Sequence, residues 1–204
     1  MTLSYSSLAE ARRMLRASLR AQRRALSPAT RKAASRAASQ HFDRRFRLPA
    51  GARVALYASM PEEIDTTPLF ELARRHGWQI YLPRIDRSRL GRRMRFVAVE
   101  GRRTRSNRLG IHEPDGSRVM GARWLDVVLV PLVGFDAKGM RIGMGAGYYD
   151  RAFAFRRWRT AWRGPLLVGF AYSLQQLPDI TSAAHDVPLD AVITEKGMIS
   201  CRTG

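Results

Sequence analysis

The segment most suited to binding a phosphorylated ligand is 139–151, GMRIGMGAGYYDR, which holds four glycines together with Arg141 and Asp150. Glycine tolerates positive φ angles and lets backbone N–H groups approach a ligand closely. An arginine guanidinium can donate two parallel hydrogen bonds to phosphate oxygens, and a carboxylate beside a phosphate site commonly helps to bind Mg²⁺. These residue types at this spacing therefore predict a site for a phosphate-bearing ligand with magnesium.

The spacing of the glycines matches neither of the common nucleotide loops. It lacks the closing Gly-Lys-Ser/Thr of a P-loop, and Gly143-Met-Gly145-Ala-Gly147 departs from G-x-G-x-x-G. A glycine-rich turn that binds nothing is the alternative interpretation, and the glycines alone do not decide between the two. Arg141 and Asp150 favour the ligand site.

Other residue types that could do chemistry show no catalytic or metal-binding spacing. His41, His76, His112 and His185 are not spaced as zinc ligands. Cys201 is the single cysteine, so it cannot form an internal disulfide. No Ser-His-Asp order is evident, and we therefore expect no covalent nucleophile.

The glycine segment needs a strand before it and a helix after it. The run 125–131, LDVVLVP, is the most apolar strand candidate, and a helix is expected from about Tyr148. The remaining pattern predicts strands at 54–58, 78–82, 94–99, 166–171 and 191–194 and a helix over 68–76 closed by Gly77. We expect 84–93 to be a loop and 101–121 to be irregular.

This alternation of strands and helices predicts an α/β fold, with a three-layer α/β/α arrangement and a mostly parallel sheet covered by helices on both faces. Open sheets of this kind bind ligands beyond the carboxyl ends of their strands, which is where the glycine segment falls. We expect one domain over residues 1–204, since this length suits a single core.

Two helices are expected before the first strand. Ser7 with Glu10 has the form of a capping box, and Ser27-Pro28 has the form of an N-cap followed by a first-turn proline. Helical spacing predicts inward faces made of Leu8, Ala11, Leu15, Leu19 and Leu26 in the first helix and of Ala33, Ala34, Ala37, Ala38 and Phe42 in the second. On this interpretation the arginines of the first helix face solvent.

The net charge of +19 comes almost entirely from arginine, since only Lys32, Lys138 and Lys196 are lysines. Such charge attracts phosphates, polyglutamates or nucleic acid. No nucleic-acid-binding motif accompanies it, so specific nucleic-acid binding is the less favoured interpretation. No apolar run approaches the roughly 20 residues of a membrane span, and no secretory signal is evident. A cytoplasmic location is therefore expected.

Four separated motifs together resemble the 5-formyltetrahydrofolate cyclo-ligase family. RIGMGAGYYDR at 141–151, preceded by LVPLVGFDAKG at 129–139, is similar to the signature of that family. YASMPEEIDTTPLF at 57–70, the closing segment 168–197 and the pattern Arg12-x-x-x-Arg16 match it too. Their order across residues 12–197 is far more specific than any one motif.

The resemblance implies conversion of 5-formyltetrahydrofolate to 5,10-methenyltetrahydrofolate with MgATP, releasing ADP and phosphate. Matching positions imply ATP contacts at Arg12, Arg16, Arg141, Ile142, Gly143, Met144, Gly145, Ala146, Gly147, Tyr148 and Tyr149. They imply substrate contacts at Ala58, Glu63, Met144, Gly145, Ala146, Gly147 and Tyr148. They imply Mg²⁺ ligands at Asp150 and Asp186. The high positive charge would also favour a folate with a polyglutamate tail, and a monomer is expected.

This sequence departs from the family pattern at two positions. Lysine is common where Arg12 stands, a change that keeps the charge with a different geometry. Many members have arginine where Met144 stands, so no role follows for that side chain. Without the resemblance, Glu63 beside Glu62 would be interpreted as an acidic helix entry near Thr66 and Asp186 as part of a solvated loop. Arg12 with Arg16 would be interpreted as an exposed helix face.

Three other functions remain open at this stage, one of which is a divergent family member with a different pterin-like or thiamine-related substrate. Another is an enzyme on a similar α/β scaffold that binds phosphate without hydrolysing ATP, such as a sugar-phosphate isomerase. The third is a non-catalytic basic protein that binds nucleic acid. A scaffold can support several chemistries, so these alternatives are separated by the site and not by the fold.

Overall fold

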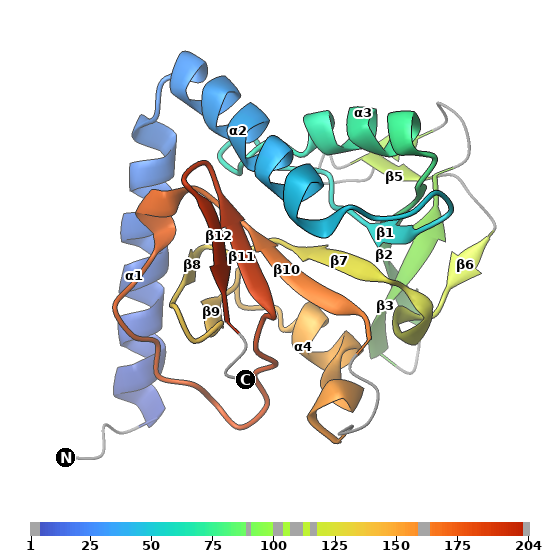
Figure 1. The fold of residues 1–204 in the computed structure, drawn as a ribbon. Helices are drawn as coiled ribbons and strands as arrows, with labels where there is room; N and C mark the ends of the chain where they lie inside the picture. Colours follow the sequence, from blue (N-terminus) through green and yellow to red (C-terminus); the bar gives the residue numbers. More distant parts are fainter. Residues whose placement is uncertain are drawn as a thin grey trace.

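A mixed eight-stranded sheet forms the centre of the fold in the computed structural model (Figure 1). The structure describes residues 5–88, 91–99, 104–106, 112–114, 118–158 and 164–201. The strands follow the order β12-β11-β10-β7-β1-β2-β3-β6. Their bounds are β1 Arg53–Ala55, β2 Gln79–Ser88, β3 Gly91–Ala98, β6 Val119–Met120, β7 Val127–Val130, β10 Leu166–Phe170, β11 Ala191–Thr194 and β12 Gly197–Ser200.

The five central strands, from β11 to β2, run parallel to one another. Only the outer strands are antiparallel: β12 pairs with β11 on one edge, and β3 and β6 continue the other. The expected mostly parallel sheet is confirmed. Parallel strands are joined by crossovers, so the carboxyl ends of β1, β7 and β10 meet at one edge of the sheet, where open α/β sheets bind ligands.

Helices cover both faces of the sheet. Helices α2 (Pro28–Phe46) and α3 (Thr67–His76) lie on one face, and α4 (Tyr148–Ala152) with the 3₁₀ turn η2 (Ala154–Trp158) lies on the other (Figure 1). Neighbouring strand residues point into two separate cores, as expected for period-2 alternation. Val54 packs with Phe42 of α2, whereas the next residue, Ala55, packs in the core that contains Phe153. The expected three-layer arrangement is thereby confirmed.

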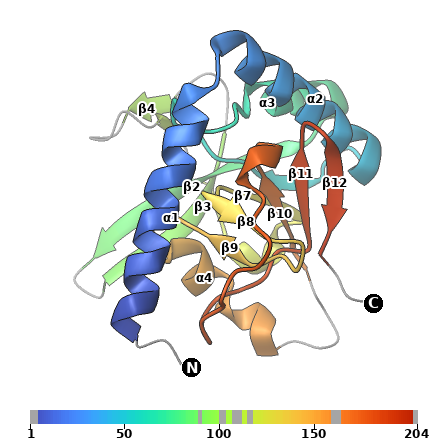
Figure 2. The same ribbon diagram turned by 90° about the vertical axis from the view of Figure 1, so that its left-hand side faces the viewer.

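Helix α1 (Tyr5–Ala25) lies outside these layers, beside the small hairpin of β8 (Gly134–Phe135) and β9 (Arg141–Ile142) in both views (Figures 1 and 2). Its Leu19 packs against Val133 and Ile142. Because Val133 follows the end of β7, this contact places α1 across the carboxyl end of the sheet.

The inward face predicted for α1 is wrong at Ala11 and Leu15, and the side chain of Leu8 lies outside what the structure describes. Leu19 is 4% exposed, but Leu15 is 39% exposed and Ala11 is exposed as well. Arg12, Arg16, Arg20 and Arg23 face the protein in their place, as a stripe at i, i+4, i+8 and i+11. The apolar pattern gave the wrong face because carbonyl and carboxylate oxygens of the neighbouring loops accept hydrogen bonds from these guanidinium groups. These hydrogen bonds offset the free-energy cost of burying the charges.

Other differences from the sequence expectations are local. Tyr5 and Ser6 are already helical, so Ser7 lies within α1 and not at its N-terminal boundary, where the capping box was expected. In α2, Ser27 is the N-cap as expected, but Ala33 is exposed. The loop expected at 84–93 is wrong for 84–88 and 91–93, which extend β2 and β3 as antiparallel strands; residues 89 and 90 lie outside the described part of the chain. The arginine-rich composition hid these strands.

The remaining elements are short. Two features were not predicted from the sequence: the edge strand β12 and the hairpin formed by β8 and β9. Strands β4 (Thr104–Ser106) and β5 (His112–Pro114) pair within the segment expected to be irregular, and the rest of 101–117 lies outside the described residues. The 3₁₀ turns η1 (Ala122–Trp124) and η3 (Ser173–Gln175) complete the chain. Among the described residues, no helix combines the length and apolar character that crossing a bilayer demands.

Candidate functional site

The hairpin of β8 and β9 presents the glycine loop, and Asp136 shapes its turn. The Asp136 side chain is fully buried, and its Oδ1 accepts the N–H groups of Lys138 at 3.0 Å and Met140 at 2.9 Å. Gly139 takes a φ of 84° in this turn, and a Cβ there would meet the carbonyl oxygen of Leu189 at 2.5 Å. Gly139 therefore serves close packing of the turn, whereas the glycines further along serve the loop itself.

The loop between β9 and α4 has an open, exposed surface. Gly145 and Gly147 have φ angles of 102° and 63°, a region that side-chain-bearing residues rarely adopt. A Cβ at Gly143 would meet nothing within 4 Å, and Met144 is 49% exposed. The following helix has only five residues, so its dipole contributes less than the sequence suggested. Exposed backbone is thus the main feature that this loop offers to a ligand.

Arg141 lies at the base of the loop and forms a buried ion pair. Its Nη2 lies 2.6 Å from Oδ1 of Asp150, its Nη1 donates to the carbonyl of Val187, and its side chain is 6% exposed. The same oxygen of Asp150 accepts the N–H of Val187 at 3.1 Å. This arrangement joins the start of α4 to the segment that follows Asp186.

Two arginines of α1 reach the same region. Arg16 donates from Nε to the carbonyl of Gly143 at 2.8 Å. Arg12 donates from Nη2 to the carbonyl of Thr181 at 2.5 Å and to Oδ2 of Asp186 at 3.1 Å. Four of the predicted residues, Arg12, Arg16, Arg141 and Gly143, are therefore gathered around one loop, although Arg12 and Gly143 lie far apart in the sequence.

The two predicted Mg²⁺ ligands are also brought together, because Asp150 bonds to the residue after Asp186. Each carboxylate pairs with one arginine: Asp150 with Arg141 and Asp186 with Arg12. The described residues contain no group of three metal-ligating side chains. Two carboxylates nonetheless fit Mg²⁺ on a nucleotide, which takes one or two carboxylates and completes its shell with phosphate oxygens and water.

Arg12 has a further donor to offer. Its Nε is buried and has no acceptor among the residues that the structure describes. A buried donor without a partner costs free energy, and a phosphate oxygen is an acceptor that would satisfy it. This observation fits an anionic ligand beside Asp186.

Glu63 lies on a different loop, after β1, and its carboxyl group is largely buried beside the charges of Glu62, Arg20 and Arg23. Its Oε2 accepts the N–H of Met60 at 2.9 Å, and its carbonyl accepts the hydroxyl of Tyr172 at 3.3 Å. Burial raises the pKa of the Glu63 carboxyl. Burial also raises the pKa of Tyr149, and the negative charge of Glu63 adds to that rise.

Helix α1 connects the Glu63 loop with the glycine loop, because Arg16 donates to the carbonyl of Gly143 and Arg20, one turn further along, pairs with Glu62. Ala58 is half-buried on the same strand end as Glu63. Tyr148 lies under the guanidinium of Arg151, at 5.1 Å from ring centroid to Cζ. Tyr149, predicted as an ATP contact, stacks against Phe153 and packs against the core that contains it.

A cavity of about 590 Å³ lies between the start of α2 and residues 59–71. Of the predicted site residues, only Glu63 lines it. Its lining carries both signs of charge, from Arg31, Lys32, Arg36, Asp65 and Glu71. The case for a phosphate ligand therefore depends on the glycine loop and not on this cavity.

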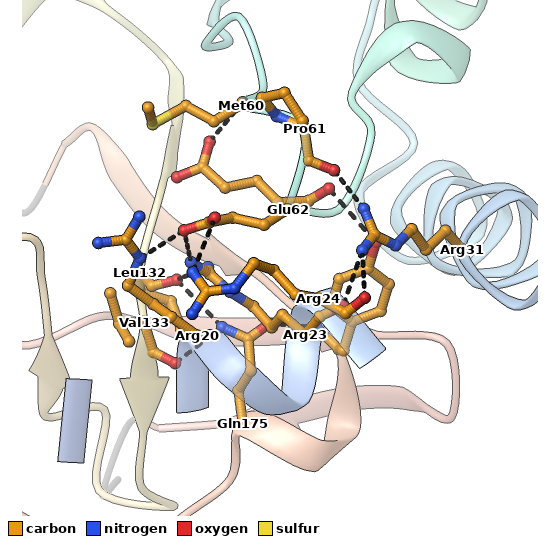
Figure 3. A network of polar contacts seen from close by, with 12 residues as sticks. Arg20, Arg23, Arg24, Arg31, Met60, Pro61, Glu62, Leu132, Val133 and Gln175 are labelled. Carbon is orange, nitrogen blue, oxygen red and sulfur yellow. Dashed lines mark hydrogen bonds and ion pairs between the residues drawn. The ribbon is translucent and has the colours of Figure 1, made fainter. Parts of the chain in front are cut away.

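Sequence reasoning missed one charged group, formed by Glu62 with Arg20, Arg23 and Arg24 of α1 and called here the Glu62 cluster (Figure 3). Glu62 was passed over as part of an acidic helix entry. The signal that could have revealed the cluster is the continuation of the Arg12–Arg16 spacing by Arg20 and Arg23, one and two turns further along the same helix face.

Comparison with protein families gives one match that spans most of the chain. The model of the 5-formyltetrahydrofolate cyclo-ligase family matches residues 8–195. Among curated proteins, 5-formyltetrahydrofolate cyclo-ligase of Escherichia coli K12 is 37% identical over 143 residues, covering 69% of this chain and 76% of that protein. The Haemophilus influenzae enzyme of the same name is 33% identical over 138 residues, covering 67% and 72%.

Solved structures give the same result. The NMR structure of Aquifex aeolicus 5,10-methenyltetrahydrofolate synthetase is 29% identical, with a TM-score of 0.79 over 95% of this chain and 94% of that chain. The synthetase from Mycoplasma pneumoniae, 24% identical with a TM-score of 0.70, supports the fold. The family model extends from α1 to the end of β11 and so includes both the arginine helix and the glycine loop. This chain belongs to the 5-formyltetrahydrofolate cyclo-ligase family of enzymes.

Proposed function

We propose that the protein converts 5-formyltetrahydrofolate to 5,10-methenyltetrahydrofolate with MgATP, releasing ADP and phosphate, and that the glycine loop binds the nucleotide. The observation that carries the proposal is the meeting of Arg12, Arg16 and Arg141 at that loop, beside Asp150 and Asp186. Membership of the cyclo-ligase family supports it.

The chemistry asks for positioning and charge rather than for a protein nucleophile. The formyl group of the substrate is an amide, so its carbon is a poor electrophile and its oxygen a poor leaving group. Transfer of the γ-phosphoryl group to that oxygen makes the oxygen a phosphate leaving group and the carbon electrophilic. N10 of the same folate then attacks the carbon and releases its proton, which closes the ring, and the C–O bond breaks so that phosphate departs. Phosphoryl transfer is catalysed largely by in-line positioning and by cations around the moving charge.

The arginines supply that positive charge. Arg16 already lies against the loop backbone through Gly143, and Arg12 has a buried Nε to offer. For Arg12 and Arg141 to bind phosphate oxygens, each must share or release the carboxylate that it now contacts. Asp150 and Asp186 are then available as ligands of Mg²⁺, which neutralises charge on the phosphates when bound.

The formylfolate belongs on the side of the loop that faces Glu63. A buried carboxylate that keeps its charge is a strong hydrogen-bond acceptor for N–H groups of a heterocycle. Ala58, Met144, Gly145, Ala146, Gly147 and Tyr148 complete the proposed substrate contacts. Because ring closure is intramolecular, holding the folate in a reactive conformation could lower the barrier by several kcal/mol, at most about 7–11.

The direct test mixes purified protein with 5-formyltetrahydrofolate and MgATP and follows two products at once. We expect the methenyl absorbance and ADP to grow in equal amounts, and both to stop when EDTA is added. Methenyl product without ADP, or ADP formed at the same rate without folate, would contradict the proposal. The proposal also includes a polyglutamylated folate as substrate, a cytoplasmic location, a monomeric state and a single domain over 1–204, which call for separate measurements.

A further inference from the structure

The Glu62 cluster joins the loop that carries Glu63 to helix α1 (Figure 3). The Glu62 carboxylate accepts hydrogen bonds from Arg20 Nε at 2.5 Å, from Arg23 Nη2 at 3.2 Å and from Arg24 Nη1 at 3.4 Å. The Glu62 side chain is only 14% exposed. One carboxylate on the loop is thus held by three cations on two successive turns of one helix.

Arg23 extends this contact to the glycine loop. Its side chain is 1% exposed, and its Nη1 donates to the carbonyl of Leu132 at 3.2 Å. The next residue, Val133, donates its N–H to the carbonyl of Ile142 at 2.7 Å. A continuous series of hydrogen-bonded residues therefore runs from Glu62 through Arg23 to the strand at the base of the glycine loop.

Gln175 holds the middle of that series in place. Its Nε2 donates to the carbonyls of Leu132 and Val133 at 3.0 and 2.9 Å. Its Oε1 accepts the N–H of Tyr172 at 2.8 Å, and the Tyr172 hydroxyl donates to the carbonyl of Glu63. The loop of Glu63 is consequently held twice, through Glu62 on one side and through Tyr172 on the other.

Arg31 fastens the start of the same loop. Its Nη1 donates to the carbonyl of Pro61, and its Nη2 donates to the carbonyls of Arg23 and Arg24 at 3.0 and 3.1 Å. The carbonyls at the end of α1 would otherwise lack intrahelical partners. The residue before Glu62 is therefore held against the same end of α1 as Glu62 itself.

We propose that Glu62 is a positioning residue that sets where Glu63 stands relative to the glycine loop, by anchoring residues 60–63 on the arginines of α1. The proposal rests on the function proposed above, in which Glu63 faces the folate and the glycine loop faces the nucleotide. Glu62 touches neither substrate in this scheme. It acts through Glu63, its neighbour in the chain, and its loss misplaces the folate more than the nucleotide.

The test compares Glu62→Gln with Arg20→Gln and with the control Arg13→Gln. Glutamine keeps the shape of Glu62 but removes the charge that holds the arginines. Arg20 makes the shortest contact with Glu62, and its side chain is 35% exposed whereas that of Arg23 is 1% exposed. Replacing Arg20 therefore threatens folding less than replacing Arg23 would. Arg13 pairs with Glu10 on the same helix, where both side chains are exposed, and neither is among the proposed site residues.

We expect Glu62→Gln to raise KM for 5-formyltetrahydrofolate about tenfold and Arg20→Gln to raise it about threefold, the scale expected when a reacting group is displaced by a fraction of an ångström. The dissociation constant of an ATP analogue, measured by calorimetry without turnover, should stay within about twofold of wild type in both. Arg13→Gln should match wild type throughout.

Two results would overturn the proposal. One is a folate KM in Glu62→Gln equal to that of wild type. The other is an equal weakening of folate binding and of nucleotide binding together with a lowered melting temperature. That result would mean that the substitution destabilises the whole fold and does not act on the folate site. Failure of the proposed function looks different, because the wild-type protein itself would then form no methenyl product.

Discussion

Nη2 of Arg141 lies 2.6 Å from Oδ1 of Asp150, and that one oxygen also accepts the backbone N–H of Val187. A residue proposed to bind phosphate and a residue proposed to bind Mg²⁺ are therefore each other's partners. Arg12 and Asp186 repeat the relationship at 3.1 Å. Binding of MgATP at this loop would exchange partners within two ion pairs, and the strength of those pairs affects both stability and affinity.

Asp150→Asn tests the metal role proposed for this carboxylate. Asparagine keeps an oxygen for the N–H of Val187 but removes the charge, so turnover should fall by about 10²–10³-fold, as when one group that stabilises developing charge is lost. Raising Mg²⁺ should recover part of the loss, which steady-state rates at several Mg²⁺ concentrations measure. The control is Asp179→Asn, which breaks the exposed pair with Lys138 and should leave the rate unchanged. Equal rates in Asp150→Asn and wild type would remove Asp150 from the site.

Replacement of Arg12 separates charge from geometry. Both of its contacts come from the single atom Nη2, so the point charge of lysine can take its place. We expect Arg12→Lys to keep kcat/KM for ATP within about fivefold and Arg12→Ala to lose about 100-fold, the latter a loss of about 2.7 kcal/mol of transition-state stabilisation. Similar losses in the two variants would mean that the guanidinium fork, and not its charge, is what the site uses.

Glu63→Gln should raise stability while it lowers activity. Burial raises the pKa of Glu63, so the folded chain binds the proton more tightly than the unfolded chain does. The charged carboxylate therefore costs stability at neutral pH, and this cost disappears as the pH falls through the folded pKa to about 4. We expect the variant to melt about 2–4 °C higher than wild type at pH 7, a gain on the scale of 1 kcal/mol, and to lose this advantage at low pH.

The measurement for Glu63→Gln is a pair of thermal melts at pH 7 and about pH 4, alongside the folate KM at pH 7. KM should rise, because glutamine cannot supply a negative acceptor to the folate. A variant that melts below wild type at neutral pH would show that the carboxylate is compensated in place, and would contradict the burial argument.

Gly145→Ala and Gly143→Ala test the backbone of the loop. Gly145 has a φ of 102°, so alanine there should cost about 1–3 kcal/mol of strain or rearrange the loop. Gly143 lacks a positive φ and would place its Cβ in open space, so alanine should leave stability within about 1 kcal/mol of wild type. Urea denaturation of both variants gives the comparison. A loop with no conformational requirement at Gly145 would show equal midpoints.

Leu19→Ala and Leu15→Ala test which face of α1 is buried. Leu19 packs against Val133 and Ile142, and its truncation should cost about 2–5 kcal/mol. Leu15 is partly exposed, and its truncation should cost less than about 0.5 kcal/mol. Equal costs by chemical denaturation would mean that the leucines, and not the arginines, form the inner face, as their spacing alone suggests.

The sequence was most informative where local pattern and tertiary structure agree. Buried parallel strands such as β7 are continuous apolar runs, Ser27-Pro28 starts α2, and Gly77 ends α3 with a left-handed φ of 68°, all as expected. The order of these elements predicts the sheet and the side on which the glycine loop lies. Antiparallel arms of the β2–β3 hairpin escaped notice because their arginines and polar residues resemble a loop.

The amino-acid sequence by itself determined the α/β class, the position of the glycine loop after a buried strand, and the family, because each depends on residues close together along the chain or on motifs in a fixed order. Only the tertiary structure decided which arginines of α1 turn inward, and which carboxylates receive them. Helical periodicity identifies residues that share a face, but it cannot say whether the partner surface is hydrocarbon or is carbonyl and carboxylate oxygen. Here Asp186 and Glu62, more than a hundred residues apart, supply that surface, and the fold alone brings both to one helix.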